Sequence, residues 1–147
     1  MPVEAQTALL SPQLRRFLGA TPPRYATIAT ANRDGSPQQI VIWFLLRDDE
    51  RGQHIVVNSR RGRRWPANLR RDGRANVAVY EAEDAVTIEC EVIDSYDDER
   101  AQADIAEMAA RYDPPEAAQR EIARFGTEQR VSFVLRPTRV HVHGDPR

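Results

Sequence analysis

The chain has 147 residues, of which 41% are apolar and 29% are charged, and its formal net charge is -1. This length and balance are typical of one soluble domain with a proper hydrophobic core. The chain has 21 arginines and no lysine, which excludes Schiff-base enzymes and Walker-type phosphate loops because both need a lysine.

The single cysteine, Cys90, excludes an internal disulfide framework and indicates a reducing compartment. No stretch approaches the roughly 18 apolar residues of a membrane span. Residues 1–20 also lack the basic segment followed by an apolar segment that marks a secretory signal. We therefore expect a cytoplasmic protein without a membrane partner. No internal repeat or linker interrupts the sequence, so we expect one domain over residues 1–147.

The first predicted elements are a short helix and a hairpin. Ser11-Pro12 has the residues of a helix start, and Gly19 ends that helix. A strand is expected over residues 25–32, followed by a hairpin turn at Asp34-Gly35. The next predicted strand covers about residues 38–47 and contains seven consecutive apolar residues, 40–46. Such a run indicates that both faces are covered, one by a barrel interior and the other by a second subunit.

The rest of the chain continues with short strands and three helices. Strands are predicted over residues 54–59, 74–81, 85–94, 130–136 and 138–143, and helices over 62–72, from 97–99 onward, and from 113–115 to 126. Pro137 separates the last two strands. Because most connections are short and the helices do not alternate with the strands, the pattern favours an antiparallel barrel with peripheral helices over a doubly wound parallel sheet.

Seven arginines and one aspartate lie in the segment 59–74, which gives it a formal charge of +6. Closely spaced guanidinium groups repel one another unless an anion neutralises them. Guanidinium groups bind phosphate and carboxylate in a bidentate geometry, and a helix N-terminus adds backbone donors. The segment therefore predicts an anionic ligand.

Two other interpretations of this segment remain open. It is a solvated basic face if its arginines pair with the acidic stretch 81–104. It is a nucleic-acid platform if the arginines grip phosphates while Trp65 stacks on a base. The pI of about 6.3 and the acidic remainder of the chain disfavour the nucleic-acid interpretation. We expect Arg70 and Arg71 to point to solvent or to the acidic stretch.

The remaining reactive residue types favour structural roles. His141 and His143 share one face of a strand and could chelate a metal, but no third ligand has a recognisable spacing. A role in an interface or pocket lining is favoured, and no metal site is predicted. We expect His54 to be exposed, Cys90 to be inert core, and Trp43 to be core more often than a cofactor-stacking ring. No G-x-S-x-G or G-x-G-x-x-G motif is present, and no catalytic acid or base stands out.

Several segments, in this order, resemble the pyridoxamine 5'-phosphate oxidase-like split β-barrel superfamily. They are Tyr25–Thr30 with the turn Asn32–Pro37, the strand ending Ile42-Trp43-Phe44, and Val56–Ser59 leading into Gly62-Arg63 and Asn68–Asp72. The sequence is most similar to the group that binds the deazaflavin coenzyme F420. The resemblance covers residues 17–94 well and residues 130–143 more loosely.

The resemblance implies a mainly β fold with peripheral helices, a split antiparallel β-barrel of the FMN-binding type. It also implies a homodimer with two cofactor sites at the subunit interface. The cofactor carries the hydride chemistry in such proteins, and the chain supplies orientation and a dry pocket. The implied cofactor-binding residues are Gln38, Trp43, Asn58, Ser59, Arg60, Arg61, Arg63, Arg64, Trp65 and Asn68.

Within this set, Arg63 matches the phosphate-binding arginine of the family. Trp65 stands where the deazaflavin group commonly has a lysine, so we expect Arg60, Arg61 or Arg64 to supply that charge, or Trp65 to stack on a ring.

The function expected from the sequence is an F420-dependent oxidoreductase that acts on a small organic substrate. Seven arginines suit a cofactor with a phosphodiester and a tail of glutamate carboxylates better than the single phosphate of FMN. The alternatives are an FMN-binding oxidoreductase of the same fold and a non-catalytic protein that binds the cofactor or another anionic ligand such as haem. The expected partners are the small-molecule substrate and a second copy of the chain, without nucleic acid.

Overall fold

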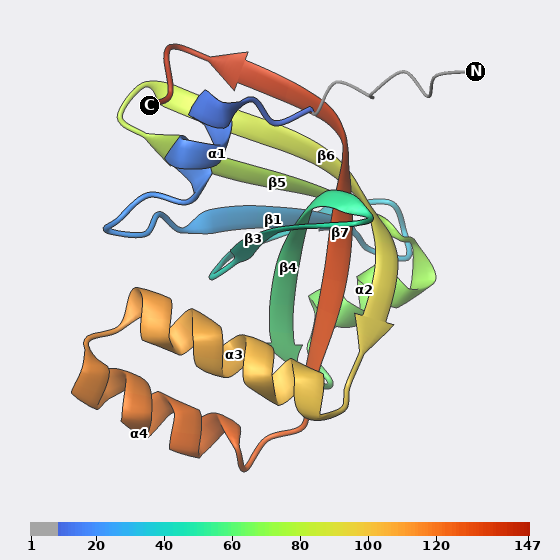
Figure 1. Cartoon of the computed structure of the whole chain (residues 1–147). Coiled ribbons are helices and arrows are strands. Elements are labelled where there is room, and N and C mark those ends of the chain that lie inside the picture. The colour runs from blue at the N-terminus through green and yellow to red at the C-terminus, as the bar shows by residue number, and fades with distance from the viewer. Residues whose placement is uncertain (1–8) are drawn as a thin grey trace.

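Seven strands form one antiparallel sheet in the order β2-β1-β5-β6-β7-β4-β3 in the computed structural model, which describes residues 9–147. The strands are β1 (Ala26–Ala31), β2 (Pro37–Ile42), β3 (Leu45–Asp49), β4 (Gly52–Arg60), β5 (Arg74–Glu81), β6 (Asp84–Tyr96) and β7 (Arg130–His143). The helices are α1 (Pro12–Leu18), α2 (Arg64–Arg71), α3 (Glu99–Tyr112) and α4 (Pro115–Phe125). Figure 1 shows a strongly curved sheet, with α3 against β4 and β7 and α4 beside α3. The mainly β fold with peripheral helices is thus confirmed.

The two edge strands of the sheet are consecutive in the chain. The chain leaves one edge at Ile42 and enters the other at Leu45, and no pairing joins β2 to β3 in the described part of the chain. The single strand predicted over residues 38–47 is therefore wrong, because it is interrupted at Trp43-Phe44. Phe44 turns fully into the barrel core, and its carbonyl accepts a hydrogen bond from Arg111 Nη1 at 2.6 Å. The backbone at the break is thereby satisfied without a strand partner.

The apolar run is not covered on both faces by this chain. Phe44 is completely buried, whereas the side chain of Val41 is 64% exposed on the outer face of β2. A large apolar group left in water on a sheet face is typical of a surface that meets another molecule.

The two final strands predicted from the sequence are one strand, β7, which runs through Pro137. The register shifts between Glu89 and Cys90 on β6, so Pro137 lies at an irregularity of the ladder. On the other side, β4 pairs with β7 only as far as Leu135. The missing N–H of Pro137 therefore leaves no ladder bond unmade, which is why a proline is tolerated here.

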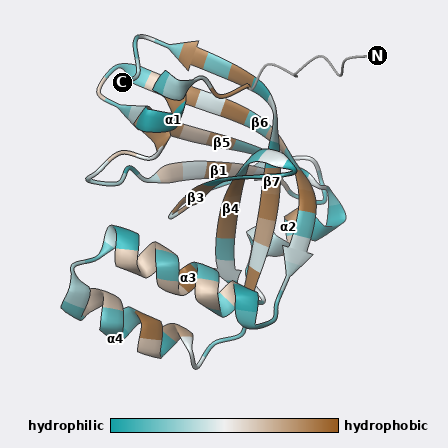
Figure 2. Cartoon of the chain, viewed as in Figure 1, coloured by the Kyte–Doolittle hydropathy of each residue, from teal (hydrophilic) through white to brown (hydrophobic). Residues whose placement is uncertain are grey.

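Two clusters of buried apolar side chains hold the elements together. The larger one fills the barrel and includes Phe17, Phe44 and Phe133, and the smaller one packs α3 and α4 onto β4 and β7 through Met108 and Phe125. Figure 2 shows hydrophobic residues concentrated on the strands and alternating with hydrophilic residues along the helices. No helix of residues 9–147 is long and apolar enough to cross a membrane.

His54 was expected to be exposed, and the structure contradicts this. Its side chain is buried on β4, and its Nδ1 lies 3.2 Å from the carbonyl oxygen of Gly52. The imidazole is enclosed at the β3–β4 turn, and the alternation of residues along a strand does not predict this burial.

Candidate functional site

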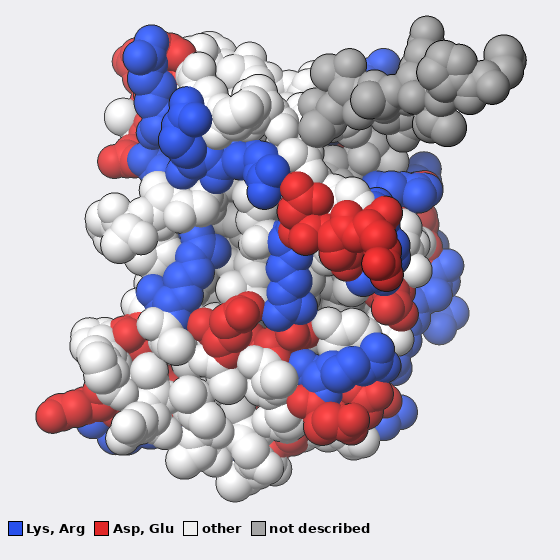
Figure 3. Space-filling view, viewed as in Figure 1, with Lys and Arg blue, Asp and Glu red and all other residues white. Residues whose placement is uncertain are grey.

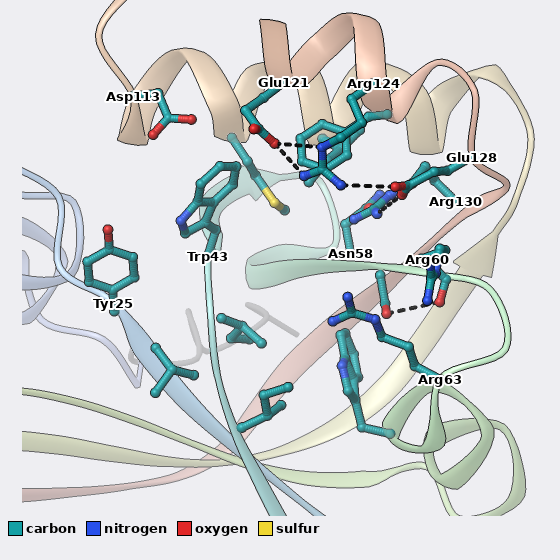
Figure 4. Close-up of a pocket in the computed structure, with 18 residues that line it drawn as sticks. Tyr25, Trp43, Asn58, Arg60, Arg63, Asp113, Glu121, Arg124, Glu128 and Arg130 are labelled. Carbon is teal, nitrogen blue, oxygen red and sulfur yellow. Dashed lines mark hydrogen bonds and ion pairs between the residues drawn. The ribbon is translucent and has the colours of Figure 1, made fainter. Parts of the chain in front are cut away.

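A pocket of about 480 Å³ lies between β2, the end of β4, the start of α2 and the α3–α4 hairpin. Its two ends differ in chemistry. In Figure 4, Tyr25 and Trp43 lie at one end, and Arg60, Arg63 and Arg130 lie at the other. The pocket therefore suits a ligand with a flat ring at one end and an anionic group at the other.

The aromatic end is built by packing between three different elements. The ring of Trp43 stacks on Tyr112 of α3, with centroids 5.3 Å apart and planes 6° apart. The ring of Phe125 on α4 contacts Trp43 edge-on, with centroids 6.3 Å apart. Trp43 lies at the break between β2 and β3, so this packing fixes a residue that the sheet itself does not hold. It is partly buried and lines the pocket, so it serves the core and the pocket together.

The cationic end depends on a tight turn between β4 and α2. Gly62 has φ of +96°, a conformation that favours glycine, and it turns the chain between Arg60 and Arg63. Arg63 is the N-cap residue of α2, and its side chain makes no capping bond. Figure 4 shows its guanidinium extending into the pocket. Among the described residues, neither Arg60 nor Arg63 forms an ion pair, so two exposed arginines that line the pocket have no carboxylate partner.

A polar cluster behind the pocket holds its wall in place. Asn58 Nδ2 donates to the carbonyl of Ala101 and to Ser132 Oγ, both at 2.9 Å, and Ser132 Oγ donates to Asp104 Oδ2 at 2.7 Å. Arg47 Nη2 and the hydroxyl of Tyr96 also donate to the Asp104 carboxylate, at 2.8 Å and 2.5 Å. Asn58 was predicted to bind cofactor, but both of its amide hydrogens are donated within the fold, where they link β4 to α3 and β7.

The structure brings six of the ten predicted site residues together in this pocket. They are Trp43, Asn58, Ser59, Arg60, Arg63 and Trp65. Trp65 is only 2% exposed and packs against Phe133 in the barrel core, so its ring reaches the pocket from within the wall.

The other four predicted residues lie outside this pocket. Asn68 is buried beneath α2, and its Nδ2 lies 3.3 Å from Gln38 Oε1 in a cluster that ties α2 to β1 and β2. Arg64 lines a separate hollow beside the β1–β2 turn. Arg61 points away, with its Nη1 3.7 Å from Asp97. Arg71 is exposed, as expected, and it also donates to Asn68 Oδ1 and to the carbonyl of Ala31, which stabilises the same cluster.

Three further residues line the cationic end and were not among the predicted site residues: Arg124, Glu128 and Arg130. Arg130 is paired across the sheet with Arg60, and this register is the only signal that places it there. Burial lowers the pKa of Arg130, the ion pair with Glu128 opposes this, and the positive charge of Arg63 lowers the pKa further. Two like charges therefore lie close together at this end of the pocket.

All seven arginines of the segment 59–74 are exposed, as the solvated-face interpretation requires, but their expected pairing with the acidic stretch is sparse. Within residues 9–147, Arg61–Asp97 is the one ion pair that joins the segment 59–74 to the acidic stretch 81–104. On the face shown in Figure 3, a run of basic side chains lies at the upper left, and acidic and basic side chains alternate over the rest. No group of three or more His, Cys, Asp or Glu side chains in residues 9–147 is placed to hold a metal, and His141 lies 2.9 Å from Glu89.

The sheet is curved and antiparallel, and its two edge strands, β2 and β3, follow each other in the chain without pairing with each other. Together with the pocket beside the helical hairpin, this arrangement defines a split β-barrel protein. The sequence matches the pyridoxamine 5'-phosphate oxidase family over residues 10–144, and the chain belongs to this family. No curated protein matches the sequence significantly.

Solved structures share this fold. An F420 reductase is 19% identical, with a TM-score of 0.62, and the match covers 96% of this chain and 98% of that chain. A conserved hypothetical protein from Mycobacterium tuberculosis is 18% identical, with a TM-score of 0.70 and coverage of 100% and 91%. The heme storage protein HutZ from Vibrio cholerae is 19% identical, with a TM-score of 0.66 and coverage of 92% and 96%. At these identities the likeness concerns the fold alone.

Proposed function

We propose that the protein is an F420-dependent oxidoreductase that binds the deazaflavin cofactor in this pocket and reduces a small organic substrate. The observation that carries the proposal is the polarity of the pocket. Unpaired Arg60 and Arg63 lie at one end, and the aromatic surfaces of Tyr25 and Trp43 lie at the other. A ring linked to a phosphodiester matches this order of groups.

The residues present fit such a cofactor. The guanidinium groups of Arg60 and Arg63 would bind the phosphodiester, and the rings of Tyr25 and Trp43 would orient the planar part and exclude water from it. When bound, the cofactor supplies the hydride chemistry. The carboxylates of Glu121 and Glu128 at the pocket rim are held in ion pairs with arginines, and Asp113 lies at the aromatic end; we assign no acid or base.

The surface next to the cationic end supports F420 over FMN. Arg63 lines both the main pocket and a neighbouring hollow of about 490 Å³, whose other basic residues are Arg61, Arg70 and Arg71. A tail of glutamate carboxylates would follow these arginines away from the phosphodiester. FMN has no such tail, so it would leave them without a partner.

The test is to mix the protein with F420 and, separately, with FMN, and to record the visible spectrum after gel filtration. Both tryptophans of the chain line the pocket, so quenching of their fluorescence gives a second measure of binding. We expect F420 to be retained and to quench. Retention of FMN alone would replace the proposal with the flavin alternative.

A non-catalytic binder of an anionic ligand is the second candidate, because the pocket offers binding groups but no evident acid or base. The fold is shared with a heme storage protein at 19% identity. Retention of F420 or haem without turnover of any reducible acceptor would favour this binder over the enzyme.

We also propose that the protein is a homodimer, with the outer face of β1, β2 and β5 at the interface. Tyr25, Val41 and Tyr80 are 56%, 64% and 67% exposed. Tyr25 and Val41 also line the pocket, so a second subunit there would complete its open side. We expect a dimer at micromolar concentration by sedimentation, with about 2,000 Å² or more buried in total. We expect Val41→Glu to shift it to monomer, and a monomeric wild type would contradict the proposal.

A further inference from the structure

Arg130 is held almost completely inside the wall of the pocket. Its side chain is 8% exposed, and its guanidinium carbon lies 4.7 Å from the ring centroid of Phe125. Its Nε donates to Asn58 Oδ1 at 2.9 Å, and its Nη1 donates to Glu128 Oε2 at 2.7 Å. Two of its three nitrogens are therefore fixed by the protein.

The third nitrogen, Nη2, has no hydrogen-bond partner within residues 9–147. No side-chain nitrogen or oxygen that is fully enclosed in the described structure lacks a partner, so Nη2 reaches open space. Because Arg130 lines the pocket, that space is the pocket. Arg63 faces the same region and acts on Arg130 as a neighbouring positive charge.

We propose that Arg130 is a second anion-binding residue of the pocket, beside Arg63, and that Glu128 limits ligand affinity by competing for the same guanidinium. The pocket then prefers ligands whose phosphate or carboxylate group is shared by two arginines. This inference rests on the proposed binding of an anionic ligand in the pocket.

The polar cluster behind Arg130 sets its direction. Asn58 donates both amide hydrogens to Ala101 and Ser132, so the amide cannot rotate without losing these bonds, and its Oδ1 stays aimed at Arg130 Nε. An arginine whose orientation is fixed before binding loses less side-chain entropy when the ligand arrives. Asn58 is thus a positioning residue.

Glu128 is held in its competing position from two sides. Its backbone carbonyl accepts from Gln102 at 2.8 Å, and its Oε1 accepts from Arg124 Nη1 at 3.1 Å. Glu121 provides the matched control, because it lines the same pocket and pairs with Arg124 but makes no bond to Arg130. Glu128→Gln and Glu121→Gln change the net charge of the pocket equally. The difference in affinity between the two variants therefore reports on Arg130.

The experiment titrates the tryptophan fluorescence of the apoprotein with inorganic pyrophosphate at two salt concentrations. We expect Arg130→Gln and Arg63→Gln each to weaken binding about tenfold, as for a charge-assisted hydrogen bond. We expect Glu128→Gln to tighten binding about threefold and Glu121→Gln to change it by less, because a freed guanidinium gains one more donor for the anion. In the double variant E128Q/R130Q the tightening should vanish relative to Arg130→Gln.

If the Arg130–Glu128 ion pair has only a structural role, Glu128→Gln should lower the stability of the protein and should not tighten pyrophosphate binding. That result, or wild-type affinity in Arg130→Gln, would overturn the inference. If Arg63→Gln weakens binding and Arg130→Gln does not, the proposed function stands and this inference falls. If the cycle behaves as expected but F420 is not retained, the proposed function alone falls. Glu128→Gln keeps the test valid if Arg130→Gln does not fold.

Discussion

Two polar regions of the molecule differ in whether their charges have partners. In the buried polar cluster of Asn58, Tyr96, Asp104 and Ser132, every enclosed side-chain nitrogen and oxygen has a hydrogen-bond partner. In the arginine corner, residues 60–64, the guanidinium groups of Arg60 and Arg63 have no carboxylate partner in the described structure. A charge that the fold neutralises stabilises the fold, and a charge that the fold leaves open is available to a ligand. The first region should therefore respond to mutation in stability, and the second in affinity.

The largest effect is expected from Asp104→Ala. The carboxylate accepts hydrogen bonds from Arg47, Tyr96 and Ser132, and its loss leaves the buried Ser132 hydroxyl and the half-buried Tyr96 hydroxyl without this acceptor, and Arg47 with Glu107 alone. We expect the free energy of unfolding to fall by about 3–5 kcal/mol, measured by urea denaturation. The control is Asp97→Ala, since Asp97 is exposed and makes only the 3.7 Å pair with Arg61. Its cost should be about 1 kcal/mol or less, and equal costs at both positions would erase the distinction between the two regions.

The second effect is expected from Arg63→Ala, and it should appear in affinity. A charge-assisted contact of about 1.5–3 kcal/mol corresponds to a loss of F420 affinity of roughly 10- to 150-fold. Stability should stay within about 0.5 kcal/mol of wild type, because Arg63 forms no ion pair within residues 9–147. The control is Arg120→Ala, an exposed arginine on α4 that lies outside the main pocket and outside the neighbouring hollow. It should change F420 affinity less than about fivefold, and equal small effects would mean that the corner is only a solvated face.

Local rules predicted the elements whose ends are set by their own residues. Ser11 caps α1 by accepting a hydrogen bond from the backbone N–H of Leu14, and Asp98 caps α3 in the same manner. β5 has the bounds predicted from the sequence, residues 74–81. The break at Trp43-Phe44 was missed because an apolar run has the same pattern whether it is one strand or two. Tertiary packing of Phe44 decides between them.

The candidate site was predictable only along one stretch of chain. The arginine corner is contiguous in sequence, so its charge is visible there. Arg130 is 72 positions from Asn58, to which it is bonded, and only the pairing of β4 with β7 brings them together. Gln38 and Asn68 were placed at the site by resemblance, but Asn68 lies on the buried face of α2, where it bonds to Gln38. Side-chain direction on a short helix depends on a rotation that sequence spacing does not fix.

A smaller effect, confined to alkaline pH, tests the buried polar cluster from its tyrosine. Burial, reinforced by the Asp104 carboxylate, raises the pKa of Tyr96 from 10.0 to about 12. The folded state therefore favours the neutral phenol. The resulting stability is complete below about pH 10 and is lost as the pH rises toward 12. We expect urea denaturation to show about 1 kcal/mol less stability at about pH 11 than at about pH 9, beyond the change seen in Tyr96→Phe. An identical pH dependence of stability in the wild type and in Tyr96→Phe would contradict the contribution of the Tyr96 hydroxyl to the cluster.

The smallest effect is expected at Cys90, which is buried like the polar cluster but has no charge and does not line the main pocket. Burial raises the pKa of its thiol to about 12, so the reactive thiolate is nearly absent at neutral pH. The thiol packs in the barrel core, away from the main pocket. We expect Cys90→Ala to retain F420 with unchanged affinity, and the native thiol to react with a disulfide reagent only after unfolding. A loss of binding or turnover in folded Cys90→Ala would contradict this and assign the thiol a part in the chemistry. Unchanged binding would show that burial alone does not mark a functional residue here.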